Sequence, residues 1–206
     1  KELEAENDLL DIDELIENAK NREKQQGKLT AKPKFMEQVQ NLTAAQKGTL
    51  MHYCVQKLDE KKDYSLDDLK NFVQDLKEQN KISELEANNI NINMLYKYTK
   101  SELCQELKEA KEIHKEEPFY INIPANKIYE EAEEKETILV QGIIDLYYIN
   151  KEGKLILVDY KTDYVPNGDV SKLEEKYKVQ LELYQEALEQ ATGKKVDKAM
   201  IWALNA

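Results

Sequence analysis

Two aspartates of this chain occupy positions where their side chains could meet across a β-hairpin. Two short apolar runs joined by a turn-like segment predict the hairpin, with Asp145 in its first strand and Asp159 in its second. Gly153 suits the left-handed position of a three-residue hairpin loop. If Asn150 pairs with Lys154, the same antiparallel register places Asp145 directly opposite Asp159.

The two carboxylates could bind a divalent cation together. Directly opposed residues of an antiparallel pair have Cβ atoms about 4.5–5.5 Å apart on one face of the sheet. Carboxylates that close repel each other unless a cation lies between them. Lys161 follows Asp159 by two residues, so it points to the same face. Two acids and one lysine at a strand end are the groups that metal-dependent hydrolysis of phosphodiesters requires.

Both faces of the predicted hairpin are largely apolar. One face is expected to carry Ile143, Asp145, Tyr147, Leu155, Leu157 and Asp159, and the other Ile144, Leu146, Tyr148, Ile156, Val158 and Tyr160. This pattern predicts a sheet covered on both sides, at least in part by helices. The alternative for the two acids is that they lie in water at the sheet end, or pair with Lys161 alone.

The composition limits the kinds of protein that this chain can be. Its 206 residues are 41% hydrophobic, enough for one large domain or one domain with an appendage. The net charge of −11 argues against a protein that holds nucleic acid by bulk charge. It leaves a nuclease possible, because acids that hold a metal count in that total. It favours delivery of DNA by another domain or a partner.

The two cysteines, Cys54 and Cys104, are too few and too far apart for a zinc or iron–sulfur motif. Unpaired thiols fit a reducing compartment, and no signal peptide or membrane-spanning run is visible, so a cytoplasmic location is expected. The chain begins at Lys1 without a methionine and ends directly after an apolar run, so it is expected to be a fragment of a larger polypeptide.

The rest of the chain predicts helices first and a mixed α/β core after them. Helices are expected at residues 9–16, from a capping box at Thr43 to about Leu58, and from Ser65, Ser83 and Ser101, with a linker at residues 21–34. A short strand is expected at residues 118–124, a loop at 130–136, a long helix capped by Ser171–Glu174 and ended by Gly193, and a final strand at residues 198–204.

Four residues outside the hairpin have side chains suited to a site, and each also has an ordinary explanation. His52 lies one helical turn after Gly48, a glycine that costs the helix up to about 1 kcal/mol unless a backbone or a metal site approaches it closely. A histidine in a helix is more often a surface or core residue. Gln180 and Tyr184 lie four residues apart on the long helix, where Tyr184 could be core and Gln180 solvated. Glu117 could be a surface acid.

Five short segments together carry a family resemblance. They are Gly48–His52, Glu117–Phe119, Gly142–Asp145, Asp159–Thr162 and Gln180–Tyr184. Their order and element types resemble the RecB family of the PD-(D/E)XK nuclease superfamily, and Lys32–Phe35 is similar too, so the likeness covers roughly residues 32 to 204. In particular, the chain resembles the nuclease domain of AddA-type (RexA) helicase–nuclease subunits.

The resemblance implies an α/β fold with a restriction-endonuclease-like mixed sheet flanked by helices and a helical N-terminal half. Residues 1–35 would connect an upstream helicase region to a nuclease domain at 36–206, truncated at its C-terminus. The implied roles are as follows: Asp145, Asp159 and Lys161 are catalytic; His52, Asp145, Asp159 and the Tyr160 backbone carbonyl bind metal; Gln180 and Tyr184 line the site and touch DNA or the lysine; and Glu117 braces the sheet or touches metal.

The implied cofactor is Mg²⁺, which prefers oxygen ligands, and Mn²⁺ could substitute because an imidazole takes part. No iron–sulfur cluster is expected, whereas AddB-type subunits carry four cysteines for one. The implied function is cleavage of one unwound DNA strand in double-strand break repair and recombination, as part of a helicase–nuclease with an AddB-type (RexB) partner. The alternatives are a stand-alone or CRISPR-associated RecB-like exonuclease, and a catalytically silent DNA-binding scaffold on the same fold.

Overall fold

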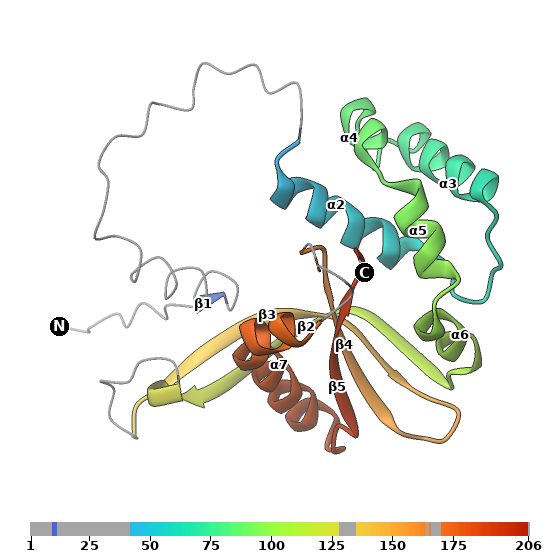
Figure 1. The fold of residues 1–206 in the computed structure, drawn as a ribbon. Coiled ribbons are helices and arrows are strands. Elements are labelled where there is room, and N and C mark those ends of the chain that lie inside the picture. Colours follow the sequence, from blue (N-terminus) through green and yellow to red (C-terminus); the bar gives the residue numbers. More distant parts are fainter. Residues whose placement is uncertain (1–9, 12–41, 128–134, 164, 166–169, 206) are drawn as a thin grey trace, which may run out of the picture.

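A computed structural model of the chain describes residues 10–11, 42–127, 135–163, 165 and 170–205 (Figure 1). The helices are α2 (Ala44–Lys57), α3 (Leu66–Glu78), α4 (Glu84–Asn89), α5 (Ile92–Thr99), α6 (Glu102–Glu109) and α7 (Ser171–Thr192), with a short 3-10 helix at Ala125–Lys127. The strands are β1 (Leu10–Asp11), β2 (Glu112–Pro124), β3 (Thr137–Ile149), β4 (Leu155–Lys161) and β5 (Lys198–Ala203). The expected mixed α/β fold with a helical N-terminal part is confirmed.

Local capping chemistry fixes where most of the helices begin and end. Thr43 accepts a hydrogen bond from the Gln46 amide, and the Gln46 side chain accepts one from the Thr43 amide, which completes the expected capping box. Ser65, Ser83 and Ser101 also cap helices as predicted. Gly193 ends α7 in the left-handed conformation, with φ of 65°.

Four expectations about the elements are wrong. The long helix α7 begins at Ser171 itself, so Val170 rather than Ser171 is in the capping position. Helix α5 was not predicted as a separate helix; Asn91 caps it. The strand expected at residues 118–124 begins already at Glu112, because the charged residues before Pro118 pair with β3. Leu10 and Asp11 form strand β1 instead of part of a helix, since they pair with the edge of β3.

The rest of the predicted N-terminal helix, the linker at residues 21–34 and most of the loop at 130–136 lie outside the described residues.

The long strand β3 organises the sheet. It pairs antiparallel with β2 along its whole length, antiparallel with β4 at its C-terminal half, and parallel with β1 at its N-terminal half. Strand β5 pairs parallel with β4, and α7 forms the crossover between them. The predicted hairpin register is confirmed, because the Asn150 amide donates to the Lys154 carbonyl at 3.0 Å and Gly153 has φ of 90°.

Helices cover both faces of the sheet, as the apolar hairpin predicted. Figure 1 shows α2 to α6 above the sheet and α7 against its other face. Leu146, Val158 and Tyr160 pack into the core beneath α2 to α6. Leu157 and Phe119 pack against Leu183, Tyr184, Ala187 and Leu188 of α7. The two cores hold the ends of β3 and β4 between α2 and α7.

The expected alternation of side chains along β3 fails beside Asp145. Ile144 was expected on the face of Leu146 and Tyr148, but it packs in the α7 core, whereas those two residues pack beneath the other helices. The cause lies on the neighbouring strand. Glu116, the residue of β2 between the partners of Ile144 and Leu146, has φ of 53° and interrupts the ladder opposite Asp145. A left-handed residue resets the pleat, so the alternation changes sense there.

The close packing at Gly142 gives a stability prediction. A Cβ at Gly142 would lie 2.7 Å from two ring carbons of Phe119, whose ring is held edge-to-face against Tyr184 with centroids 5.4 Å apart. Because a buried ring cannot move aside freely, Gly142→Ala is expected to cost about 1–3 kcal/mol of unfolding free energy. Thermal melts measure this. Phe119→Leu in the same chain is the control and should recover part of the loss, and an unchanged melting temperature for Gly142→Ala alone would contradict the packing.

Candidate active site

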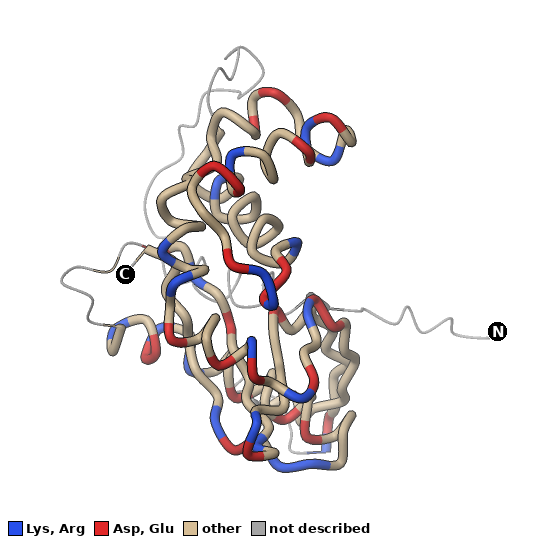
Figure 2. The backbone as a smooth tube through the Cα atoms, turned by 90° about the vertical axis from the view of Figure 1, so that its right-hand side faces the viewer, with Lys and Arg blue, Asp and Glu red and all other residues tan. Residues whose placement is uncertain are grey.

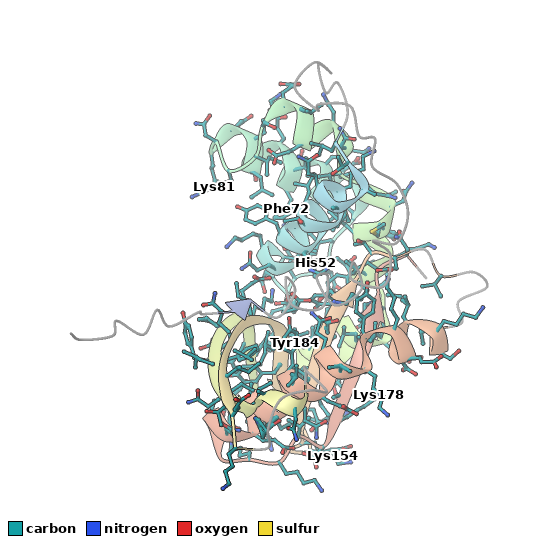
Figure 3. All side chains as sticks on the ribbon, turned by 90° about the vertical axis from the view of Figure 1, so that its left-hand side faces the viewer. His52, Phe72, Lys81, Lys154, Lys178 and Tyr184 are labelled. Atoms are coloured by element: carbon teal, nitrogen blue, oxygen red, sulfur yellow. The ribbon has the colours of Figure 1, made fainter. Side chains whose placement is uncertain are left out.

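Three residues from distant parts of the sequence meet at the ends of β3 and β4. Nδ1 of His52, on α2, lies 3.6 Å from Oδ1 of Asp145, on β3. Asp159, on β4, is close enough for its charge to act on His52. Figure 3 shows His52 on the helical side above the sheet and Tyr184 below it, towards α7. The expected meeting of His52 with Asp145 is therefore present, although about ninety residues separate them.

Gly48 allows α2 to come this near to the sheet. A Cβ at Gly48 would lie 2.7 Å from Oγ1 of Thr162, just after the end of β4. The close approach that the sequence predicted is therefore made by the side chain of Thr162, not by a backbone. One helical turn after Gly48, the helix presents His52 to Asp145.

Asp145 is held in place by the backbone of the neighbouring strand. Its Oδ2 accepts a hydrogen bond of 2.8 Å from the amide of Tyr160, which leaves Oδ1 towards His52. The ring of Tyr160 is fixed in turn: its hydroxyl lies 2.8 Å from that of Tyr98, and its edge meets the His52 ring with centroids 6.1 Å apart. These contacts orient the carboxylate and the imidazole before any ligand arrives.

Asp159 is buried and only partly compensated. Its side chain is 3% exposed, and Oδ2 lies 2.8 Å from Nζ of Lys161, yet this oxygen makes no hydrogen bond of normal geometry with the described residues. Burial and the charge of Asp145 raise the pKa of Asp159 to about 6, although Lys161 and His52 act in the opposite direction. A buried acid with a raised pKa is typical of functional sites.

The charge of His52 responds to the same acids. Burial lowers the pKa of His52, but the contact with Asp145 and the negative charges of Asp145 and Asp159 together outweigh burial and raise the pKa above its usual value. Lys161 opposes them. The alternative that the aspartates pair with Lys161 alone does not describe this geometry, because Asp145 faces the imidazole.

Glu116 is a member of the site that the sequence did not indicate. Burial and the charge of Asp145 raise the pKa of Glu116, while His52 and Lys57 lower it, so its carboxylate shares the field of the other acids. Glu117, the acid named from the family pattern, is exposed and pairs with Ile144 in the sheet. The positive φ of Glu116 selects between the two neighbours, and no local sequence signal announces that conformation.

Gln180 and Tyr184 lie inside the protein. Both are 3% exposed, and Nε2 of Gln180 donates to the Tyr184 hydroxyl at 3.0 Å. Tyr184 packs on Phe119 beside Gly142, so three of the five family segments meet in one packed cluster beneath the site. The solvated position first considered for Gln180 is wrong. Contact of the pair with DNA or with Lys161 stays a prediction.

The donors at the site suit a hard divalent cation. Two carboxylates and one imidazole face the same place, and Asp159 has a buried oxygen with an incomplete set of partners. A cation there would relieve the repulsion that raises the pKa of Asp159. Within the described part of the chain, no three His, Cys, Asp or Glu side chains are already drawn together as tightly as around a bound ion.

His52→Ala is expected to weaken binding of Mn²⁺ by at least about tenfold. Even residues that only orient a metal ligand change affinity by about 10–100-fold, and His52 is placed as a ligand itself. Titration calorimetry measures the affinity. The control is His114→Ala, the only other histidine, which stacks on Tyr147 with ring centroids 4.4 Å apart. Equal effects of the two substitutions would remove His52 from the ligand set.

The two thiols lie away from this site. Cys54 and Cys104 are buried in the core beneath α2 to α6, and burial raises the pKa of Cys54 to about 12 and of Cys104 to about 11. In the described part of the chain, no helix has the length and apolar character needed to cross a membrane.

The class of the protein follows from a family comparison that agrees with this geometry. A family model described as the PD-(D/E)XK nuclease superfamily matches residues 24–206, so the chain belongs to that superfamily.

The particular relatives are large subunits that carry the name ATP-dependent helicase/nuclease. That of Thermoanaerobacter sp. (strain X514) is 42% identical over 173 residues, which are 82% of this chain and 14% of the relative. That of Acetivibrio thermocellus is 36% identical over 178 residues, 84% of this chain and 14% of the relative. That of Clostridium novyi is 34% identical over 179 residues, 85% of this chain and 14% of the relative. The chain therefore spans about one seventh of the length of these relatives.

Proposed function

We propose that this chain is the metal-dependent DNA nuclease domain of an AddA-type helicase–nuclease, acting in double-strand break repair and recombination. The observation that carries the proposal is the convergence of His52, Asp145, Asp159 and Lys161 at one sheet end. The relatives support it, because their printed name joins a helicase with a nuclease.

The residues divide the chemistry between them. His52, Asp145, Asp159 and the Tyr160 carbonyl would hold Mg²⁺, or Mn²⁺ in its place. When bound, the ion supplies an activated water and neutralises charge that develops on the phosphate. Lys161 shares a face with Asp159 and adds a positive charge where the scissile phosphate lies. Tyr160 fixes Asp145 through its amide, so the carboxylate keeps its direction during the reaction.

The distribution of charge bears on how DNA reaches the site. Figure 2 shows acidic and basic residues interspersed along the described chain. With a net charge of −11, the domain attracts DNA weakly over long distances. Helicase domains of the same polypeptide and an AddB-type partner would deliver the strand instead. The site then needs local charge only at the cleaved phosphate, and Lys161 provides it.

The proposal is tested by incubating the purified chain with end-labelled single-stranded DNA. Cleavage is expected in Mg²⁺ or Mn²⁺ and is expected to stop when EDTA is added, while the same DNA without the protein stays intact. A chain that binds DNA and Mn²⁺ but cuts no strand in either ion would contradict the nuclease proposal and leave a DNA-binding scaffold.

A further inference from the structure

A tyrosine of α7 lies against the lysine of the site. Nζ of Lys161 is 4.3 Å from the centroid of the Tyr177 ring, within the range of a cation–π contact. The ring packs against a small core of Val165, Leu173 and Ile201. Lys161 is therefore held from two sides, by the carboxylate of Asp159 and by the face of an aromatic ring.

The ring of Tyr177 is itself anchored. Its hydroxyl donates to Oδ2 of Asp163 at 3.1 Å, and Asp163 is ion-paired with Lys176. Nζ of Lys176 also lies 4.5 Å from the centroid of the same ring. Burial raises the pKa of Asp163, but the contacts with Lys176 and Tyr177 outweigh it and lower that pKa below its usual value. An ionised Asp163 keeps the tyrosine hydroxyl, and so the ring, in one orientation.

We propose that Tyr177 is the positioning residue for Lys161, keeping its ammonium at the cleavage site when Asp159 is engaged by a divalent cation. The inference rests on the proposed function.

The physical reason is that the two partners of Lys161 respond differently to a cation. A carboxylate that ligates a dication has less negative charge to offer an ammonium, and the dication repels that ammonium. An aromatic ring is not a ligand that a hard divalent cation prefers, so its attraction for Lys161 persists. Among the described residues, the ion pair of Lys161 is the one with Asp159. The ring is the partner that remains.

The experiment compares three variants. Tyr177→Phe keeps the ring and removes the hydroxyl, whereas Tyr177→Leu removes the ring and keeps an apolar side chain. Tyr96→Leu is the matched control, because it removes a ring 5.5 Å from Nζ of Lys100, at the helical end of the chain. If Tyr177→Leu does not fold, Tyr177→Met takes its place, since methionine adapts to irregular space.

Two measurements are made on each folded variant. The first gives kcat and KM for cleavage of single-stranded DNA in Mg²⁺. The second follows acetylation of Lys161 by acetic anhydride, using peptide mass spectrometry, with and without Ca²⁺. Cation–π contacts correspond to about 2- to 30-fold in an equilibrium. Tyr177→Leu is expected to lower kcat by about 3- to 30-fold with KM within about twofold, and to speed acetylation of Lys161, most in Ca²⁺. Tyr177→Phe and Tyr96→Leu should stay within about twofold of the parent chain.

The opposite results overturn the proposal. If Tyr177→Leu leaves both kcat and the acetylation of Lys161 unchanged, the ring only fills the core. If Tyr177→Phe and Tyr177→Leu lose the same activity, the hydroxyl and not the ring is responsible. If the parent chain cuts no DNA, the proposed function fails by itself, and the acetylation rates still decide whether Tyr177 holds Lys161.

Discussion

Asp159→Ala is expected to reduce DNA cleavage by at least about 1,000-fold, which corresponds to about 4 kcal/mol in the activation barrier. Asp159 is the most buried acid of the site, and its partly unpartnered oxygen faces the place where the metal is proposed to bind. Cleavage of single-stranded DNA in Mg²⁺ measures the effect. Asp67→Ala is the control, because Asp67 lies exposed on α3. Parent-like cleavage by folded Asp159→Ala would remove Asp159 from the mechanism.

The same site predicts a gain in stability without metal. The ordinary pKa of 3.8 describes Asp159 in the unfolded chain, and burial with Asp145 raises it to about 6 in the folded chain. The folded protein therefore holds the proton more tightly. The free energy of unfolding should fall as pH rises from about 4 to about 6, and above that range the full cost of the ionised group, at most roughly 3 kcal/mol, is present.

Asp159→Asn removes this titration. The metal-free variant is expected to be more stable than the parent chain at pH 7.5, by about 1–2 kcal/mol once the lost ion pair with Lys161 is counted. It should also lose most of the change in stability between pH 4 and pH 6. Urea unfolding with EDTA at several pH values measures both effects. A variant less stable than the parent chain at pH 7.5 would show that the ion pair outweighs the burial of Asp159.

Lys161→Ala is expected to lower cleavage by about 100-fold or more while changing the affinity for Mn²⁺ by less than about threefold. The ammonium supplies positive charge that counts most in the transition state, and loss of one such donor typically costs about 10²–10³ in kcat. Lys161 is 14% exposed, so its charge is poorly screened by water. Calorimetry and cleavage assays on one preparation separate binding from chemistry.

The matched control for this variant is Lys154→Ala, since Lys154 lies exposed at the turn of the same hairpin. If Lys161 only neutralises the two acids, its loss would lower the melting temperature and leave cleavage unchanged. That outcome would remove the main mechanistic claim made for this lysine.

Local rules determined much of this protein from its sequence. Side-chain caps such as Thr43 with Gln46 depend on residues three apart, so they can be read without the fold. The hairpin register follows from the turn at Gly153, and it fixed which strand positions carry Asp145 and Asp159. The family pattern added His52, which no local rule could have brought to the sheet.

Only the tertiary structure decided the remaining features of the site. Glu116 and not Glu117 joins the acids because a left-handed residue interrupts β2 opposite Asp145, and that conformation is imposed by pairing with β3. The same interruption moved Ile144 to the α7 face. Tyr177 meets Lys161 because α7 crosses back over the sheet. Such contacts depend on how packed layers meet, and the residues that make them carry no local signal of their partners.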